Sequence, residues 1–178
     1  FLTGNLSSYQ AEVFYSLKLA GIPKDSTECR VIMMVGLHSK VAFSLVSYSK
    51  LKKNVQSKAF SKNQAGGKSV GNECIIHTAQ SLLIQRPHLD FLSADAYKAY
   101  YTMNRDLALD TVKKEFPEVF NMFLQKYNNN ANAFISGMRE GIVNLQQSEG
   151  GSPGSPEMSF LYELSISPFI KNIEELCS

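Results

Sequence analysis

The stretch Phe91–Arg105, FLSADAYKAYYTMNR, decides how this chain is expected to fold. It opens with four uncharged residues, Phe91–Ala94, which is typical of a short strand buried on both faces. A single carboxylate, Asp95, follows, and the alanines around it leave space beside its side chain. An acid at the end of a central strand, with space before it, is well placed to hold a divalent cation. The alternative is a surface turn aspartate, which spacing alone favours.

Sequence signals for helices lie both before and after this stretch. Asn104 is expected to cap a helix, because acidic Asp106 lies in its first turn and basic Lys113 and Lys114 in its last. Periodicity predicts further helices from Ser7 or Ser8 to about Leu19, over His38–Leu51, from Asn72 to about Gln85, and from Pro117. Val31–Val35 reads as a short buried strand, and Ala133–Ser136 and Ile142–Leu145 as a hairpin.

A second informative stretch is Gly150–Phe169, GGSPGSPEMSFLYELSISPF. The run QQSEGGSPGS before and within it has the composition of a flexible linker. A well-formed helix start argues against a linker, since Ser155 suits the N-cap, Pro156 the first helical position and Glu157 the first turn. A bare turn of glycine and serine ahead of a helix lets a ligand pack closely against the backbone.

The segment Asp95–Arg105, DAYKAYYTMNR, resembles the first palm motif of reverse transcriptases, an aspartate followed four residues later by alanine and an aromatic residue. The stretch from Gly150 looks like the next palm motif of that family, a turn leading into a long helix. Their order and separation fit the family, and the similarity covers roughly residues 24 to 176. The nearest relatives by this resemblance are the enzymes of non-LTR retroelements.

This resemblance implies an α+β fold with the fingers and part of the palm of a right-handed polymerase, its helices packed on a small antiparallel sheet. Residues 1–88 would form the fingers-like region and residues 89–178 the first part of the palm. The implied activity is RNA-directed DNA synthesis by two-metal nucleotidyl transfer with Mg²⁺ or Mn²⁺. The implied partners are an RNA template, a DNA primer and deoxynucleoside triphosphates.

The resemblance also assigns site residues. Asp95 would be the catalytic metal ligand, with the backbone carbonyl of Ala96 as a second ligand. Arg30 would reach the triphosphate, with Lys24 as a weaker candidate, because a guanidinium donates two parallel hydrogen bonds to phosphate. Tyr100 would exclude a ribose 2′-hydroxyl, although a core tyrosine is the alternative. The turn beneath the nascent base pair and the incoming nucleotide would comprise Gly151, Ser152, Pro153 and Ser155.

The sequence departs from the family pattern in three places. Tyr101 stands where many relatives have a second acid, and Glu149-Gly150-Gly151 replaces a Gln-Gly pair. The repeated Gly-Ser-Pro also leaves the register open between Gly151 and Gly154, of which Gly151 fits the later proline and serine better. The family's pair of aspartates does not occur before Ser178, so we expect these 178 residues alone to be inactive.

Charge is distributed unevenly along the chain. The formal net charge is only +2, yet Cys29–Asn72 contains eight basic and no acidic residues, which leaves −6 for the remainder. Such asymmetry indicates a surface that binds polyanions, although a solvated lysine-rich face is the usual alternative. Within this segment, Gly66–Ser69 (GGKS) lacks the earlier glycine of a phosphate-binding P-loop, because position 62 is Lys.

Composition bounds the remaining possibilities. Three widely spaced cysteines suggest neither a zinc site nor a disulfide framework, and no apolar run is long enough for a membrane span. We therefore expect an intracellular protein, cytoplasmic or nuclear. The chain opens on Phe1 without a methionine, so we expect further sequence at both ends.

The rival hypothesis to the polymerase is a degenerate polymerase remnant that only binds nucleic acid or packs against a partner. An RNA-directed RNA polymerase is a third option.

Overall fold

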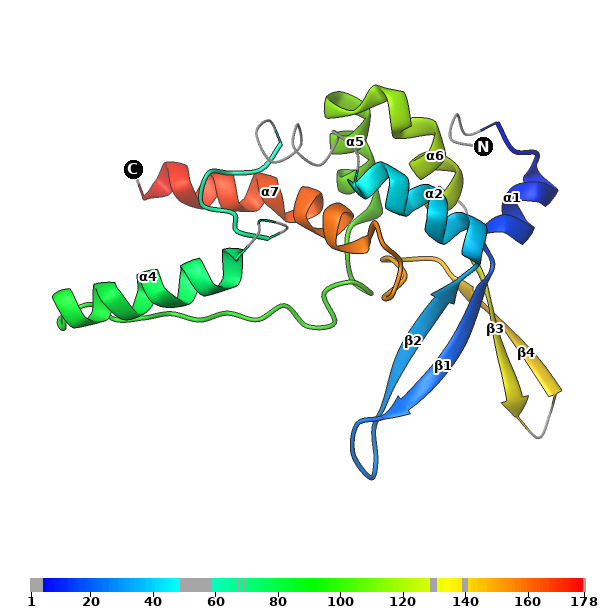
Figure 1. The fold of residues 1–178 in the computed structure, drawn as a ribbon, viewed down its shortest axis with the longest axis horizontal. Coiled ribbons are helices and arrows are strands. Elements are labelled where there is room, and N and C mark those ends of the chain that lie inside the picture. Colours follow the sequence, from blue (N-terminus) through cyan, green and yellow to red (C-terminus); the bar gives the residue numbers. More distant parts are fainter. Residues whose placement is uncertain are drawn as a thin grey trace.

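The computed structural model describes residues 5–48, 59–66, 68, 70–128, 131–138 and 141–177. These residues form six helices and one four-stranded sheet, which confirms the predicted mixture of helices and strands (Figure 1). The helices are α1 (Ser8–Tyr15), α2 (Leu37–Tyr48), α4 (Gly71–Gln85), α5 (Arg105–Glu115), α6 (Pro117–Tyr127) and α7 (Met158–Leu176). The strands are β1 (Leu17–Pro23), β2 (Cys29–Val35), β3 (Ala131–Met138) and β4 (Gly141–Gln147).

The sheet is mixed, with the strand order β2-β1-β3-β4. Two antiparallel hairpins, β1–β2 and β3–β4, are joined by a short parallel contact in which Leu17 pairs with Ala133 and Leu19 with Ile135. The antiparallel sheet predicted from the sequence is therefore wrong at its central pair. Parallel pairing needs a long crossover between the two strands, and the chain from β2 to β3 supplies it with α2, α4, α5 and α6.

The first predicted helix is shorter than its apolar spacing suggested. It ends at Tyr15, and the next residues form β1 instead of continuing to Leu19. The cause is tertiary, because Leu17–Pro23 gains a complete antiparallel ladder with β2 and the side chain of Leu17 is only 1% exposed. The predicted N-cap is confirmed, since the Ser7 hydroxyl accepts a hydrogen bond from the backbone N–H of Gln10.

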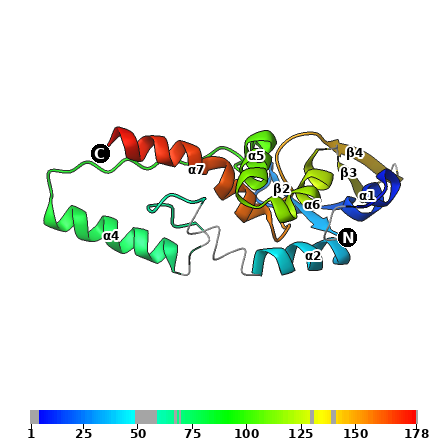
Figure 2. The same ribbon diagram turned by 90° about the horizontal axis from the view of Figure 1, so that it is seen from above.

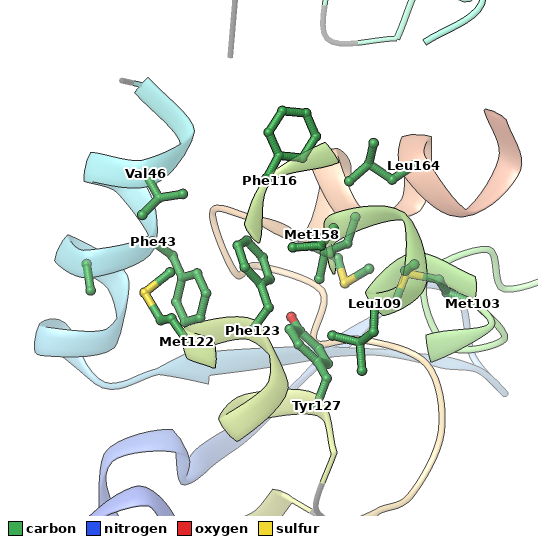
Figure 3. Close-up of a cluster of buried hydrophobic side chains, with 14 of the residues drawn as sticks. Phe43, Val46, Met103, Leu109, Phe116, Met122, Phe123, Tyr127, Met158 and Leu164 are labelled. Carbon is green, nitrogen blue, oxygen red and sulfur yellow. The ribbon is translucent and has the colours of Figure 1, made fainter. Parts of the chain in front are cut away.

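Most of the core lies between helices, and the sheet projects away from them (Figure 1). Figure 3 shows how α2, α5, α6 and α7 contribute Phe43, Leu109, Phe123 and Leu164 to one cluster. The rings of Phe43 and Phe123 meet edge to face with centroids 5.3 Å apart. Among the described residues, Leu17, Met33 and Ala133 of the strands form a separate small cluster. The helices therefore pack mainly on one another, although α1 also contacts β3 as expected of helices packed on a sheet.

The region between α4 and α5 differs most from the sequence prediction. The chain leaves α4 and returns to the helical body as an extended segment (Figures 1 and 2). Phe91–Ala94 is not a buried strand, because no described residue pairs with it and Leu92 is 92% exposed. A run of apolar residues can indicate a strand, but only neighbouring strands can bury it. Helix α4 is exposed over most of its length, with Gly71 its one buried residue.

None of the helices in the described part of the chain is both long enough and apolar enough to cross a membrane.

We predict that Phe123→Ala lowers the free energy of unfolding by about 3–5 kcal/mol, because it removes a fully buried ring from the cluster in Figure 3. Leu92→Ala should change that free energy by less than about 0.5 kcal/mol, since its side chain is exposed. Urea unfolding followed by circular dichroism measures both. A loss of more than about 1 kcal/mol for Leu92→Ala would show that this segment is buried after all.

Candidate functional site

Asp95 lies in the exposed extended segment, immediately before a turn that leads to α5. Lys98 adopts a left-handed conformation in this turn, and its carbonyl oxygen accepts a hydrogen bond from the N–H of Tyr101 at 2.8 Å. Both Asp95 and Ala96 are exposed. The predicted metal ligand is therefore open to solvent, but the strand that was expected to carry it is absent from the described residues.

Tyr100 and Tyr162 place this turn against α7. Their rings meet edge to face, with centroids 5.5 Å apart and an interplanar angle of 77°. The pKa of Tyr162 is raised, first by partial burial and then by the charges of Glu163, Tyr100 and Asp95. The carboxylate of Asp95 therefore lies within electrostatic reach of the tyrosine pair. Tyr100 itself is half-buried.

The glycine-rich turn, which we define as Gly150–Pro156, contacts the Tyr100 turn directly. The N–H of Gly151 donates to the carbonyl oxygen of Tyr100 at 2.7 Å. Gly150 has a φ of +60°, and a Cβ atom there would lie 2.1 Å from the carbonyl oxygen of Tyr101. A Cβ atom at Gly151 would lie 1.9 Å from the sulfur of Met158. Glycine is therefore required at position 150, where φ is positive and the clash is with backbone, whereas a side chain at position 151 would have to displace the end of the Met158 side chain.

The serine hydroxyls of the glycine-rich turn face protein atoms. Ser152, which is 2% exposed, donates to the side-chain oxygen of Gln147 at 3.0 Å. Ser155, which is 7% exposed, is hydrogen-bonded to Lys126 and Glu157. The residues of the turn that reach solvent are Gly154, which is exposed, and Pro153 and Pro156, which are part-exposed. Among the residues predicted to contact a nucleotide in this turn, only Pro153 reaches solvent appreciably.

A further backbone hydrogen bond fixes the turn. The carbonyl oxygen of Pro153 accepts a hydrogen bond from the N–H of Met33 in β2 at 3.1 Å.

The predicted helix start is wrong by two residues, because α7 begins at Met158 and its N-cap is Glu157. The Ser155 hydroxyl does not cap α7, because it accepts a hydrogen bond from Lys126 and donates one to the carboxylate of Glu157.

Arg105 is an important residue of this region that the sequence did not single out. Its Nε donates to the carbonyl oxygen of Gly150 at 2.6 Å, and its two terminal nitrogens donate to the carbonyls of Tyr127, Gln147 and Glu149 at 3.2–3.3 Å. Partial burial lowers its pKa, and Tyr127 and Glu149 oppose this shift. One guanidinium thus joins α5, α6 and the start of the glycine-rich turn.

A sequence signal for Arg105 exists in hindsight. No acidic residue lies three or four positions away on either side of it, so it lacks the helical ion pair that is typical of a surface arginine. Its partners are backbone carbonyls from two distant segments, which no local pattern could identify.

A buried ion pair between Lys126 and Glu157 was also missed. Lys126 lies one turn after buried Met122 on α6, and lysine is rarely fully buried. The sequence predicted for Glu157 only the role of an acid in the first turn of the helix that follows Ser155. Next to this pair, burial and the charge of Glu157 raise the pKa of Tyr15 to about 12.

The remaining predicted residues are only partly described. The backbone of Arg30 lies in β2 opposite Ile22, but its side chain is outside what the structure describes. Of the eight basic residues predicted to bind a polyanion, Lys40, Lys62 and Lys68 are described and exposed. The other four lysines, at positions 50, 52, 53 and 58, lie outside the described ranges, as do Gly67 and Ser69 of the rejected P-loop.

A complete metal site is not found within the described part of the chain. No group of three or more histidine, cysteine, aspartate or glutamate side chains there could hold an ion together. Asp95 alone offers one exposed carboxylate, which does not meet the needs of a Mg²⁺ site.

Comparison with known proteins adds no family assignment, because the sequence matches no protein-family model and no curated protein.

We predict that Arg105→Ala lowers the free energy of unfolding by about 2–4 kcal/mol, because three part-buried carbonyl groups and one exposed carbonyl group lose a charged donor. Arg105→Lys should recover less than half of this loss, since a single ammonium cannot reproduce the planar fork. Urea unfolding measures both, with Arg86→Ala as an exposed control. Equal stability of Arg105→Ala and the parent would contradict the structural role.

We predict a loss of stability between pH 10 and 12 that depends on Tyr15. The unfolded chain loses this phenolic proton near pH 10, whereas the folded chain keeps it to about pH 12. Stability therefore falls as pH rises through this window, by on the order of 2–3 kcal/mol. Urea unfolding at a series of pH values should show a shallower fall for Tyr15→Phe than for the parent. Exposed Tyr9→Phe serves as the control, and identical slopes for Tyr15→Phe and the parent would refute the assignment.

Proposed function

We propose that this chain supplies the fingers and the first part of the palm of an RNA-directed DNA polymerase of the non-LTR retroelement type. The observation that supports this most directly is the contact between the two motif stretches. They lie about 50 residues apart in sequence, yet Gly151 donates a hydrogen bond to Tyr100 and Arg105 donates one to Gly150. In a polymerase these two stretches would have to enclose one nucleotide together.

In this proposal Asp95 provides one carboxylate for a Mg²⁺ or Mn²⁺ ion, and Tyr100 lies beside the sugar of the incoming nucleotide. Nucleotidyl transfer depends mainly on positioning and charge neutralisation. The other metal ligands would come from residues beyond the described ranges, because Asp95 has no group of partner ligands within them. The described residues alone would therefore bind nucleic acid without extending a primer.

The glycine-rich turn takes a modified role in this proposal. Its outer surface at Pro153 and Gly154 would lie under the base pair. Gly151, Ser152 and Ser155 would shape the turn from within, because their polar groups are already bound to the protein. Arg30 and the lysines of Cys29–Asn72 would contact the triphosphate and the template, so that binding weakens with salt.

The deciding experiment uses the longest form of the protein that can be expressed, with Asp95→Ala and the matched control Asp90→Ala. Both residues are exposed and lie in the same extended segment. We expect Asp95→Ala to abolish primer extension on RNA, by at least about 100-fold, while the affinity for a primer–template duplex stays within about threefold. Asp90→Ala should leave both unchanged. Fluorescence anisotropy and gel-based extension measure the two quantities.

The same experiment separates the alternatives. Equal loss of duplex binding and extension in Asp95→Ala would indicate a structural role for Asp95. Duplex binding without any extension by the parent protein would favour the non-catalytic remnant, a reading that the missing ligand group within the described residues also supports. If Tyr100→Ala newly admits ribonucleotides, the RNA-directed RNA polymerase is excluded.

A further inference from the structure

Glu157 is completely buried at the start of α7, where it closes the glycine-rich turn. Its Oε1 accepts hydrogen bonds from the ammonium of Lys126, from the hydroxyl of Tyr127 at 2.7 Å and from the hydroxyl of Ser155 at 2.8 Å. Its other oxygen, Oε2, has no hydrogen-bond partner among the described residues. Three donors from two segments therefore converge on one carboxylate oxygen.

Lys126 approaches the same point from α6. It is 3% exposed, its Nζ donates to the Ser155 hydroxyl at 2.7 Å, and its Nζ lies 4.5 Å from the ring centroid of Phe43 in α2. Burial lowers the pKa of Lys126, and the charge of Glu157 opposes that shift. The ammonium thus sits in the helical core with Ser155 and Glu157 as its polar partners.

A pair of this kind contributes little net stability. Removing two charges from water costs as much as, or more than, their attraction returns, and apolar residues of similar volume often do equally well. What apolar residues cannot do is fix a direction, because hydrophobic contact is not directional. The contribution of the pair to the structure is therefore one of orientation. The group that the pair orients is the Ser155 hydroxyl.

We propose that Lys126 and Glu157 are a positioning pair that holds the glycine-rich turn in one conformation through Ser155. The pair fixes the C-terminal end of the turn, Arg105 fixes its beginning, and Pro153 and Gly154 lie between these two anchors. The functional part of this proposal rests on the polymerase function proposed above. There the pair sets the surface on which the base pair lies, although neither residue touches the substrate.

Backbone hydrogen bonds of the turn provide a test that does not depend on activity. The N–H of Ser155 donates to the carbonyl of Ser152 at 3.0 Å, that of Met158 to Ser155 at 3.1 Å, and that of Met33 to Pro153 at 3.1 Å. Hydrogen exchange at these three amides reports whether the turn keeps its conformation.

The first variant is the double substitution Lys126→Met and Glu157→Met, which removes both charges and keeps the volume. Its melting temperature should fall, because the buried Tyr127 hydroxyl loses its acceptor, but it should fall less than in either single substitution, which leaves one charge buried alone. Exchange at the three amides should nevertheless rise at least about tenfold in the double variant, while exchange in α5 is unchanged. Unchanged exchange at the turn would overturn the proposal.

The second variant, Ser155→Ala, leaves the ion pair intact and removes only the bridging hydroxyl, so it remains informative if the double variant does not fold. It should raise exchange at the same amides with little change in melting temperature. Ser165→Ala is the matched control, because Ser165 is a buried serine of α7 that bonds only within its own helix. Equal exchange in Ser155→Ala and Ser165→Ala would overturn the proposal.

The consequence for function is measured separately, in the longest expressible protein. We expect the double variant to bind a primer–template duplex with a complementary deoxynucleotide about tenfold more weakly than the parent, and duplex alone equally well. An unchanged nucleotide dependence would overturn the functional part. If the parent itself shows no nucleotide-dependent binding, the polymerase proposal fails, and the exchange experiment still decides whether the pair positions the turn.

Discussion

The structure depends on how a glycine-rich stretch of backbone is buried without leaving its polar groups unpaired. The turn Gly150–Pro156 passes between the Tyr100 turn, β2 and the helical core, and Gly150, Gly151, Ser152 and Ser155 are buried there. Its N–H and C=O groups must then find partners in the protein. They find them in Tyr100, Met33 and the guanidinium of Arg105. The helices and the sheet are thereby joined at one place, because each of these partners comes from a different element.

Two cations complete this arrangement by different chemistry, Lys126 buried and Arg105 part-buried. Arg105 donates its hydrogen bonds to backbone carbonyls, so its planar fork can join distant segments, and its guanidinium also lies 5.8 Å from the ring centroid of Tyr127. Lys126 binds the side chains of Ser155 and Glu157, so it depends on the identity of both. The stretch that composition would assign to a flexible linker is therefore among the most tightly held parts of the molecule. It is also the part that the proposed function would use as a rigid surface.

The segment that carries Asp95 is, in contrast to the glycine-rich turn, exposed to solvent. Neither the segment nor α4 before it is covered by other described elements, and apolar side chains such as Ile84 and Leu92 remain exposed there. The carboxylate is accessible, and its charge contributes to the raised pKa of Tyr162, yet no hydrogen bond from the described residues fixes its direction. The chain thus combines a hydrogen-bonded glycine-rich turn with an exposed segment that carries Asp95, and the proposed polymerase function requires metal ligands beside Asp95 that the described residues do not supply.

The sequence by itself determined the local features of this protein. The caps at Ser7 and Asn104, the helices α2, α4, α5 and α6 and the β3–β4 hairpin follow from short-range propensities and from side chains that bond within four residues. Tertiary structure alone decided the rest. Leu17–Pro23 became a strand because β2 pairs with it, and Phe91–Ala94 did not because no strand is beside it. Arg105, Lys126 and Glu157 acquired their roles from partners up to 45 residues away, and no local pattern encodes which distant groups a buried charge will meet.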